Sequence, residues 1–236
     1  MNQPAALIPA PSKRNLLQRL KALELPISEI VDVGVREKTG ELLEAFPEHL
    51  HHLFEPVSAF FPDLKRNYAK VPHVLYPMAL SDRNETKYLS VTSLLRNGVA
   101  THSRIVDQST KVDGLEVISC EQLQVRRFDS IGAATQTDFL LKVDVDGPDL
   151  EVLKGFGAKL SMASVVVIEA TVWNWLQRAA YLEKNGFQLL DVIDLVYYGD
   201  AVYQFDLAFI RRNLVTNRVN PPISLFEGRL WKPFRP

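Results

Sequence analysis

Continuous apolar runs and segments of helical periodicity alternate along residues 29–80. The apolar runs are EIVDVGV (29–35), HHLFEPV (51–57) and HVLYPMAL (73–80), with one helix through LLEAF and another up to about Tyr68 between them. Runs that are apolar at consecutive positions, rather than at every second one, are typical of strands buried on both faces. The pattern therefore predicts a βαβαβ series, and hence a parallel sheet covered by helices.

The same alternation returns in the second half of the chain. It comprises DFLLKVDVDG, a helix over 148–160, SVVVIEA (164–170), a helix near 173–185, and finally FQLLDVIDLV and YQFDLAFIRR. Only YYGDAV links the last two runs, which is too short for a crossover helix, so they should form an antiparallel hairpin. Seven strands with helical crossovers and such a hairpin resemble the class I methyltransferase (Rossmann-like) α/β fold, which has a seven-stranded, mostly parallel sheet with helices on both faces.

Three segments fall outside this alternation. Residues 1–28 begin with a proline-rich arm, followed by a helix with leucines at helical spacing. Residues 84–137 hold short β-like pieces between polar stretches, and we expect them to form an insertion over the sheet. Residues 213–236, with a Pro-Pro pair and several aromatics, should be a C-terminal tail across the surface. The main domain then spans residues 29–212 and includes the insertion.

The composition narrows the range of partners. The 236 residues are 47% hydrophobic and 23% charged, with 27 Lys plus Arg against 28 Asp plus Glu, a formal net charge of −1. This balance creates no long-range basic field and there is no dense Lys/Arg run, so nucleic acid is not an expected partner. No stretch approaches the ~20 apolar residues needed to cross a bilayer. We expect a cytoplasmic protein without a membrane partner.

Cysteine and histidine usage argues against metal chemistry. Cys120 is the only cysteine, which excludes an internal disulfide and a multi-cysteine zinc site, and we expect it to be a buried structural residue. His49, His51 and His52 flank a strand start without the spacing that places two histidines on one helix face. The sequence therefore predicts no metal site.

Acidic residues end the first two predicted strands. In open α/β sheets the ligand binds beyond the carboxyl ends of the strands. Asp32 ends the first strand, with Gly34 two residues on, and Glu55-Pro56 ends the second strand 23 residues after Asp32. That spacing is close to the one at which an acid holds ribose hydroxyls in nucleotide-binding folds. An Asp-x-Gly turn or a strand-ending Glu is common by itself, but the two in register favour ligand binding.

Two later strands also end in carboxylates. Asp144 and Asp146 alternate with valines, so both point to one face of an apolar strand, which is unfavourable without water, a cation or a hydrogen-bond donor nearby. Glu169 ends VVVIEA. Asp149 and Glu151, in the first turn of the next helix, are sufficiently explained by the helix dipole. Asp144, Asp146 and Glu169 are therefore the candidates for chemistry.

VDVG, HHLFEP, ALSD (79–82), FDSI (128–131), FLLKVDVDGPDLEVLKG and VVVIEA occur in the order of the FkbM-type S-adenosylmethionine-dependent methyltransferases, which the chain resembles over about residues 29–212. The resemblance implies S-adenosyl-L-methionine as cofactor. Asp32 and Gly34 would border its methionine part, Glu55 would take the ribose hydroxyls, and the adenine would lie near Ser81 and Asp82. The complete implied cofactor-binding set is Asp32, Gly34, Val35, Glu55, Pro56, Leu80, Ser81 and Asp82.

The resemblance implies O-methylation of a hydroxyl on a small-molecule or sugar/glycan acceptor. An alcohol is a poor nucleophile until its proton leaves, so a general base is expected, with Asp144 the first candidate and Asp146 and Glu169 behind it. Family members commonly have VDVGAN where this chain has Val35 and Arg36. That difference supports an alternative, a non-catalytic methyltransferase-fold binding module. A nicotinamide-dependent oxidoreductase is a further alternative, opposed by the missing glycine-rich phosphate loop.

Two groups of residues are candidates for contact with the acceptor. Residues 84–137 should form one wall of the cavity that faces the methyl group, with Arg96, His102 or Arg104 reaching it, although this segment could instead only cover a sheet edge. The second group is aromatic and consists of Trp173, Trp175, Tyr197, Tyr198 and Tyr203. These could stack on a sugar or an aromatic acceptor, but the tryptophans are expected in the core, whereas Tyr197 and Tyr198 fall at a predicted exposed hairpin tip.

Overall fold

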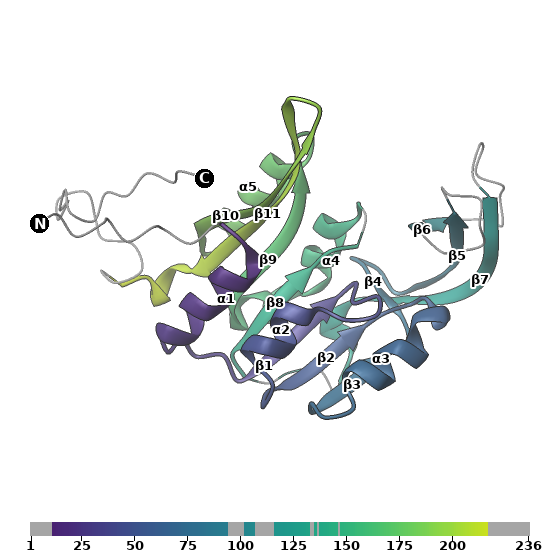
Figure 1. Ribbon diagram of the computed structural model, residues 1–236, viewed down its shortest axis with the longest axis horizontal. Coiled ribbons are helices and arrows are strands. Elements are labelled where there is room, and N and C mark those ends of the chain that lie inside the picture. The colour runs from purple at the N-terminus through teal and green to yellow at the C-terminus, as the bar shows by residue number, and fades with distance from the viewer. Residues whose placement is uncertain are drawn as a thin grey trace, which may run out of the picture.

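The structure of the protein is a computed structural model that describes residues 11–93, 102–106, 116–132, 135, 137–145 and 147–216. A central seven-stranded sheet has the order β10-β11-β9-β8-β1-β2-β3 (Figure 1). Its strands are β1 (Glu29–Val33), β2 (Leu50–Phe54), β3 (His73–Tyr76), β8 (Phe139–Val143), β9 (Ala163–Thr171), β10 (Phe187–Tyr198) and β11 (Ala201–Arg211). Pairing is parallel from β3 through β9 and antiparallel for β9 with β11 and β11 with β10. The predicted sheet and its terminal hairpin are confirmed.

Helices cover both faces of this sheet, as predicted. The helices are α1 (Lys13–Ala22), α2 (Gly40–Ala45), α3 (Phe61–Asn67), α4 (Asp149–Gly155) and α5 (Trp175–Lys184), with 3-10 turns η1 (Ser58–Phe60), η2 (Phe128–Ser130), η3 (Gly157–Met162) and η4 (Arg212–Leu214). Buried side chains of α1 and α2 share one hydrophobic cluster with β1, β8 and β9, whereas those of α4, α5 and η2 share the opposite one. No helix in the described ranges is long and apolar enough to span a membrane.

The α1 helix shows how the local sequence sets an element. Ser12 caps it by accepting a hydrogen bond from the Asn15 amide at 3.3 Å. Leu16, Leu17 and Leu20 all face the core and are at most 1% exposed. Burying one such side chain contributes about 1.5–3 kcal/mol, so these three leucines hold α1 against the sheet.

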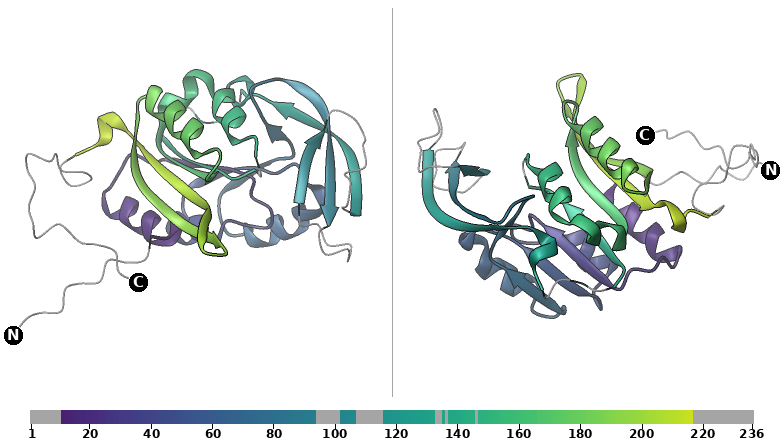
Figure 2. Two further views of the ribbon diagram at one scale, coloured as in Figure 1. Left: turned by 90° about the horizontal axis from the view of Figure 1, so that it is seen from above. Right: turned by 180° about the vertical axis from the view of Figure 1, so that it is seen from behind.

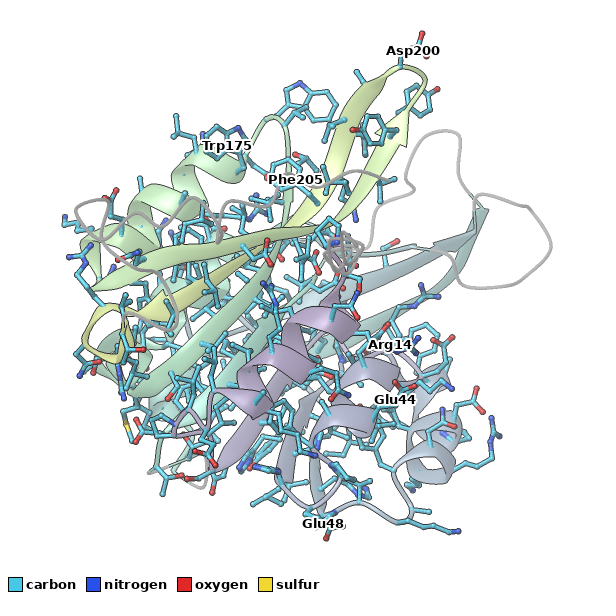
Figure 3. All side chains as sticks on the ribbon, turned by 60° about the vertical axis from the view of Figure 1, so that its left-hand side comes forward. Arg14, Glu44, Glu48, Trp175, Asp200 and Phe205 are labelled. Carbon is cyan, nitrogen blue, oxygen red and sulfur yellow. The ribbon has the colours of Figure 1, made fainter. Side chains whose placement is uncertain are left out.

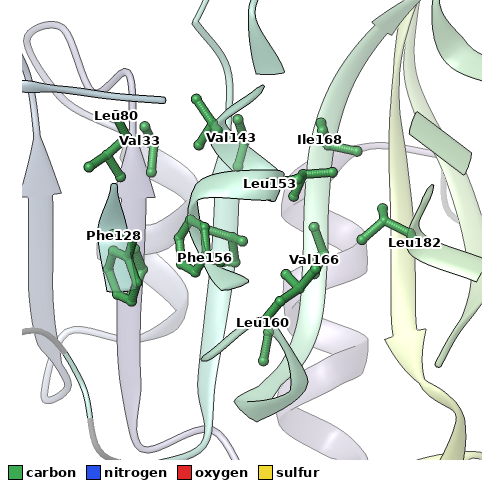
Figure 4. Packing of buried hydrophobic residues seen from close by; sticks show 14 of the residues in the cluster. Val33, Leu80, Phe128, Val143, Leu153, Phe156, Leu160, Val166, Ile168 and Leu182 are labelled. Carbon is green, nitrogen blue, oxygen red and sulfur yellow. The ribbon is translucent and has the colours of Figure 1, made fainter. Parts of the chain in front are cut away.

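The core on the opposite face is built around stacked phenylalanines. The rings of Phe128 and Phe156 lie 4.0 Å apart, and Leu153, Val143 and Val33 belong to the same cluster (Figure 4). Residues 148–160, predicted as one helix, are instead α4 and η3, separated at Phe156. Gly157, with φ +52°, adopts a left-handed conformation that an α-helix cannot include.

The run HVLYPMAL was predicted as a single strand, and this is wrong. β3 ends at Tyr76, and Ala79–Leu80 forms a separate strand, β4, in a second sheet. Pro77 has no amide hydrogen to continue the ladder, and the Met78 amide turns back to the Tyr76 carbonyl at 2.8 Å. The chain therefore leaves the central sheet at Pro77.

The segment that interrupts the α/β alternation forms this second sheet. Its order is β4-β7-β5-β6, with β5 (Glu85–Ser93), β6 (His102–Val106) and β7 (Glu116–Arg126). It is joined to the rest by a small cluster of Val57, Ala79, Leu123 and Val125. Figures 1 and 2 show the second sheet and the β10–β11 hairpin rising at the two sides of the molecule, beyond the same edge of the central sheet.

Candidate functional site

Charged side chains gather at the carboxyl ends of β1, β8 and β9, on the face that carries α1 and α2. Asp32 of β1 is in register with Lys142 of β8, and the side chains of Asp144 and Glu169 follow on the same face. In an open α/β sheet this edge is where ligands bind. The topology therefore brings together three of the predicted site residues, and Lys142 with them.

Lys142 is buried at the centre of this group. Its Nζ lies 3.3 Å from Asp32 Oδ1 and 3.4 Å from Asp144 Oδ2, and it donates a hydrogen bond to the Gly34 carbonyl at 2.7 Å. Burial by itself lowers the pKa of Lys142, but Asp32 and Asp144 outweigh burial and raise that pKa above its ordinary value. Lys142 thus stays an ammonium ion. Our sequence reasoning missed it, although a lysine inside the apolar run FLLKV was a signal.

Asp32 has hydrogen-bonding capacity to spare. Its side chain is fully buried, yet neither carboxylate oxygen makes a hydrogen bond within the described ranges. The Lys142 ammonium is a counter-ion at 3.3 Å rather than a well-directed donor. Buried carboxylate oxygens are seldom left without donors, so Asp32 can accept hydrogen bonds from a ligand or from water.

Gly34 is required by the neighbouring strand. Its φ is +80°, and a Cβ placed on it would lie 1.8 Å from the Asp144 carbonyl oxygen. The Asp144 amide also donates to the Val33 carbonyl at 3.0 Å, so the backbones after β1 and β8 are in direct contact. The glycine of the Asp-x-Gly turn therefore allows close backbone packing here, independently of any ligand.

Glu55 ties together the loops that follow β1 and β2. Its Oε2 accepts a hydrogen bond from the Arg36 amide and its Oε1 from the Val57 amide, each at 2.8 Å. Burial raises the pKa of Glu55, and the two amides oppose this. Arg36 adopts a left-handed conformation, with φ +54°, and the hydrogen bond that its amide donates to Glu55 helps to hold that strained backbone.

The other predicted cofactor-binding residues differ in what their side chains can contact. The side chains of Val35 and Leu80 are buried in hydrophobic clusters, which leaves only their backbones for a ligand. Ser81 and Asp82 are half-buried and joined by a hydrogen bond of 3.4 Å. A Cβ on Gly155 of α4 would lie 2.1 Å from the Ser81 carbonyl oxygen. The glycine that ends the DLEVLKG motif thus allows α4 to pack against this segment. Pro56 is half-buried beside Glu55.

Asp144 and Glu169 form a carboxyl pair. A side-chain hydrogen bond joins them, and the Gln204 amide donates to Glu169 Oε2 at 2.8 Å. Burial acts to raise the pKa of Asp144, but Lys142, the bond with Glu169 and Lys13 of α1 together lower it. The lowered pKa of Asp144 makes it the ionised member of this pair at neutral pH. The Asp144 side chain is 37% exposed, so it can face a ligand.

The loop after β8 is held by a buried ion pair. Asp149 pairs with Arg178 of α5 and accepts a hydrogen bond from the Val145 amide at 3.2 Å, while Arg178 donates to the Gly147 carbonyl at 3.1 Å. Both charged side chains are nearly inaccessible to solvent. The helix dipole is therefore an incomplete explanation of Asp149. Asp146, which lies in this loop, falls outside the described residues.

The expectation that the tryptophans lie in the core is wrong. Trp173, in the turn after β9, is 70% exposed, and Trp175, the first residue of α5, is 41% exposed (Figure 3), because no described element covers them. Tyr197 and Tyr198 are exposed as well. The Trp173 ring meets the Tyr203 ring edge-on, with centroids 5.3 Å apart.

The second sheet reaches the site near Glu55. Val57, whose amide binds Glu55, packs against Leu123 and Val125 of β7. Arg96 lies outside the described residues, as do the side chains of His102, Arg104 and Cys120. The predicted role of this segment at the methyl group stays a prediction.

The sheet order, the terminal hairpin and the acids at the strand ends define a class I methyltransferase fold. Residues 32–190 match the family described as "Methyltransferase FkbM domain", and the chain belongs to this family. Membership confirms the predicted resemblance, and the family implies S-adenosylmethionine as cofactor.

Solved methyltransferase structures are similar to this one. The METTL16 methyltransferase domain shares 12% identity over 89% of this chain and 72% of that chain, with a TM-score of 0.46. A TehB-like SAM-dependent methyltransferase from Corynebacterium glutamicum shares 12% identity over 83% of this chain and 86% of that chain, with a TM-score of 0.42. An rRNA methylase from Streptococcus thermophilus shares 8% identity over 84% of this chain and 93% of that chain, with a TM-score of 0.44. No curated protein matches the chain.

Proposed function

We propose that this protein binds S-adenosylmethionine and transfers its methyl group to a hydroxyl oxygen of a small-molecule or sugar acceptor. The observation that carries the proposal is the cluster of Asp32, Lys142 and Asp144 at the ligand-binding edge of the sheet, in a chain of the FkbM family. The net charge of −1 supports an acceptor other than nucleic acid.

The residues around the cluster fit the cofactor. The free lone pairs of the Asp32 oxygens suit the ammonium group of its methionine part. Each Glu55 oxygen binds one backbone amide and keeps a lone pair for a ribose hydroxyl. The half-buried side chains of Ser81 and Asp82 are available to the adenine. When bound, the cofactor supplies an electrophilic methyl group.

Asp144 is the residue placed to act on the acceptor. Its lowered pKa keeps it ionised at neutral pH, so it accepts a hydrogen bond from the acceptor hydroxyl and fixes the direction of the oxygen lone pair. A carboxylate with a lowered pKa is a weak base, so the proton moves to Asp144 late, as the acceptor oxygen loses electron density. Lys142, already an ammonium ion, takes no proton; it holds Asp144 in place.

A binding module without transferase activity is the second candidate. Both Glu55 oxygens are engaged by backbone amides, one of them from Arg36, whose left-handed conformation costs about 1–3 kcal/mol. Asparagine, common in the family at the position of Arg36, adopts this conformation more readily.

Calorimetric titration with S-adenosylhomocysteine tests the proposal. Glu55→Ala should weaken binding by about 10–150-fold through loss of hydrogen bonds to a charged acceptor. Glu183→Ala, an exposed change on α5, is the control and should bind as the wild type does. An unchanged dissociation constant in folded Glu55→Ala would rule out the role of Glu55 in binding the ribose. A wild-type protein that binds neither S-adenosylmethionine nor S-adenosylhomocysteine would refute the proposal. Binding without labelled-methyl transfer to any alcohol or glycoside supplied would favour the module.

A further inference from the structure

The segment that should bind the adenine, Ser81 and Asp82, is held from outside the central sheet. The chain leaves that sheet at Pro77, and β4 pairs instead with β7, with Leu80 in register with Arg126. The Ser81 amide extends this pairing by donating to the Arg126 carbonyl at 3.0 Å. The position of Asp82 therefore depends on the residues at the end of β7.

Arg127, the first residue after β7, binds several parts of the chain at once. Its Nη1 donates to the Asp82 carbonyl at 2.8 Å, and its amide donates to the Asn84 side-chain oxygen at 2.8 Å. Its Nε and Nη2 donate to the two carboxylate oxygens of Asp129, at 2.9 and 2.5 Å. Nη2 also reaches the Lys154 carbonyl at 3.5 Å. One guanidinium thus joins the segment after β4 to the η2 turn and to α4.

The ion pair of Arg127 and Asp129 lies against closely packed backbone. A Cβ on Gly157 would lie 2.3 Å from Asp129 Oδ2 and 3.3 Å from Arg127 Nη2. Leu80 and Phe128, on either side of this junction, are buried in the same hydrophobic cluster (Figure 4). A bidentate pair between arginine and a carboxylate fixes direction as well as distance. Arg127 is therefore a rigid support for the Asp82 backbone.

The Asp82 carboxylate keeps one oxygen for a ligand. The Ser81 hydroxyl lies 3.4 Å from its Oδ1 and the Arg83 Nε lies 3.6 Å from the same atom, whereas Oδ2 has no such partner among the described residues. A carboxylate only accepts hydrogen bonds. An Oδ2 atom held in place suits the 6-amino donor of adenine and repels the 6-oxygen of hypoxanthine. A carboxylate that is free to move can turn to the N1–H of hypoxanthine instead.

We propose that Arg127 is a positioning residue for cofactor recognition. By holding the Asp82 backbone, it keeps the Asp82 carboxylate directed at the 6-amino group, so that the protein selects adenosine over inosine in its cofactor. Asp82 would contact the purine, and Arg127 acts through Asp82. This inference rests on the proposed function and adds to it the residue that sets the choice of purine.

Calorimetric titration with S-adenosylhomocysteine and S-inosylhomocysteine tests the inference, because these ligands differ at position 6 of the purine. The wild type should bind S-adenosylhomocysteine about tenfold more tightly or better, as expected for one hydrogen bond to a charged group. Arg127→Met should bring the two dissociation constants within about threefold of each other, mainly by weakening S-adenosylhomocysteine. Arg127→Lys should do the same, because an ammonium lacks the planar fork that reaches both Asp129 and the Asp82 carbonyl.

Arg66→Met is the matched control. Arg66 also forms an ion pair with an aspartate, Asp63 at 2.5 Å, but on α3, with its side chain 71% exposed. This variant should keep the wild-type ratio of the two dissociation constants. Circular dichroism shows whether each variant is folded.

Four results would overturn the inference: a wild type that does not discriminate between the ligands, an equal weakening of both ligands in the Arg127 variants, the same change of ratio in Arg66→Met, or loss of folding in both Arg127 variants. The second and fourth would make Arg127 a structural residue only. Binding of S-adenosylhomocysteine without discrimination would remove the inference alone. A wild type that binds neither ligand would refute the proposed function, and the inference with it.

Discussion

Replacing Lys142 with methionine should destabilise the protein strongly. Lys142→Met keeps the length of the side chain but removes the ammonium that lies 3.3 Å from Asp32 and 3.4 Å from Asp144. It also removes the hydrogen bond of 2.7 Å to the Gly34 carbonyl. Asp32 is fully buried, so the variant would leave a carboxylate inside the protein without its counter-ion.

The size of the effect follows from burial. Removing one partner of a buried ion pair costs about 3–5 kcal/mol, because the remaining charge loses solvation without compensation. The Asp144 side chain is 37% exposed, and water screens its share of the interaction. We therefore expect a loss near the lower end, about 3 kcal/mol, most of it from Asp32.

The loss should depend on pH. The raised pKa of Lys142 contributes stability below its ordinary value of 10.5, and this contribution is lost as the pH rises through the higher folded-state value. The lowered pKa of Asp144 contributes stability above its ordinary value of 3.8, and this is lost as the pH falls through the lower folded-state value. The difference between wild type and Lys142→Met should thus be large at pH 7 and smaller near pH 3.

Urea unfolding followed by circular dichroism measures both the loss and its pH dependence. Lys154→Met is the control, since Lys154 lies in a half-exposed pair with Glu151 at 3.6 Å and should contribute at most about 1 kcal/mol. If Lys142→Met unfolded at the same urea concentration as Lys154→Met, or showed the same loss at pH 7 and pH 3, the assigned role of Lys142 as the central counter-ion would be refuted.

Two further predictions concern the residues next to Lys142. Asp144→Asn should lower methyl transfer by about 10²-fold or more while changing S-adenosylhomocysteine affinity only a few-fold, because the amide keeps the shape and loses the proton acceptor; near-normal turnover would show that Asp144 is structural. Gly34→Ala should cost more than about 2 kcal/mol or prevent folding, since its Cβ would lie 1.8 Å from the Asp144 carbonyl oxygen at φ +80°. Gly40→Ala is its control, with open space around the new Cβ and a helical position where alanine is favoured. Equal urea midpoints for these two glycine variants would contradict the close packing of β1 on β8.

The central sheet could be predicted from the sequence because its information is local. Consecutive apolar residues indicate strands buried on both faces, and a six-residue link excludes a crossover helix. Parallel strands place their carboxyl ends at one edge of the sheet. The positions of Asp32, Glu55 and Asp144 at strand ends were therefore enough to predict that they lie in one region. The FkbM motifs lie along these same strands, and for that reason the family was identifiable as well.

Only the tertiary structure determines which residues far apart in the chain contact each other. No local pattern pairs Asp149 with Arg178, or selects Lys142 as the ion between Asp32 and Asp144; strand order and helix packing do. Exposure of Trp173 was mispredicted for the same reason, because an apolar side chain is buried only where another element covers it. The break at Pro77 shows the remaining limit, since the residues after it pair with β7, about 45 positions further along the chain. Hydrophobic periodicity determines which segments are buried, whereas the contacts between distant segments determine which charges meet at the site.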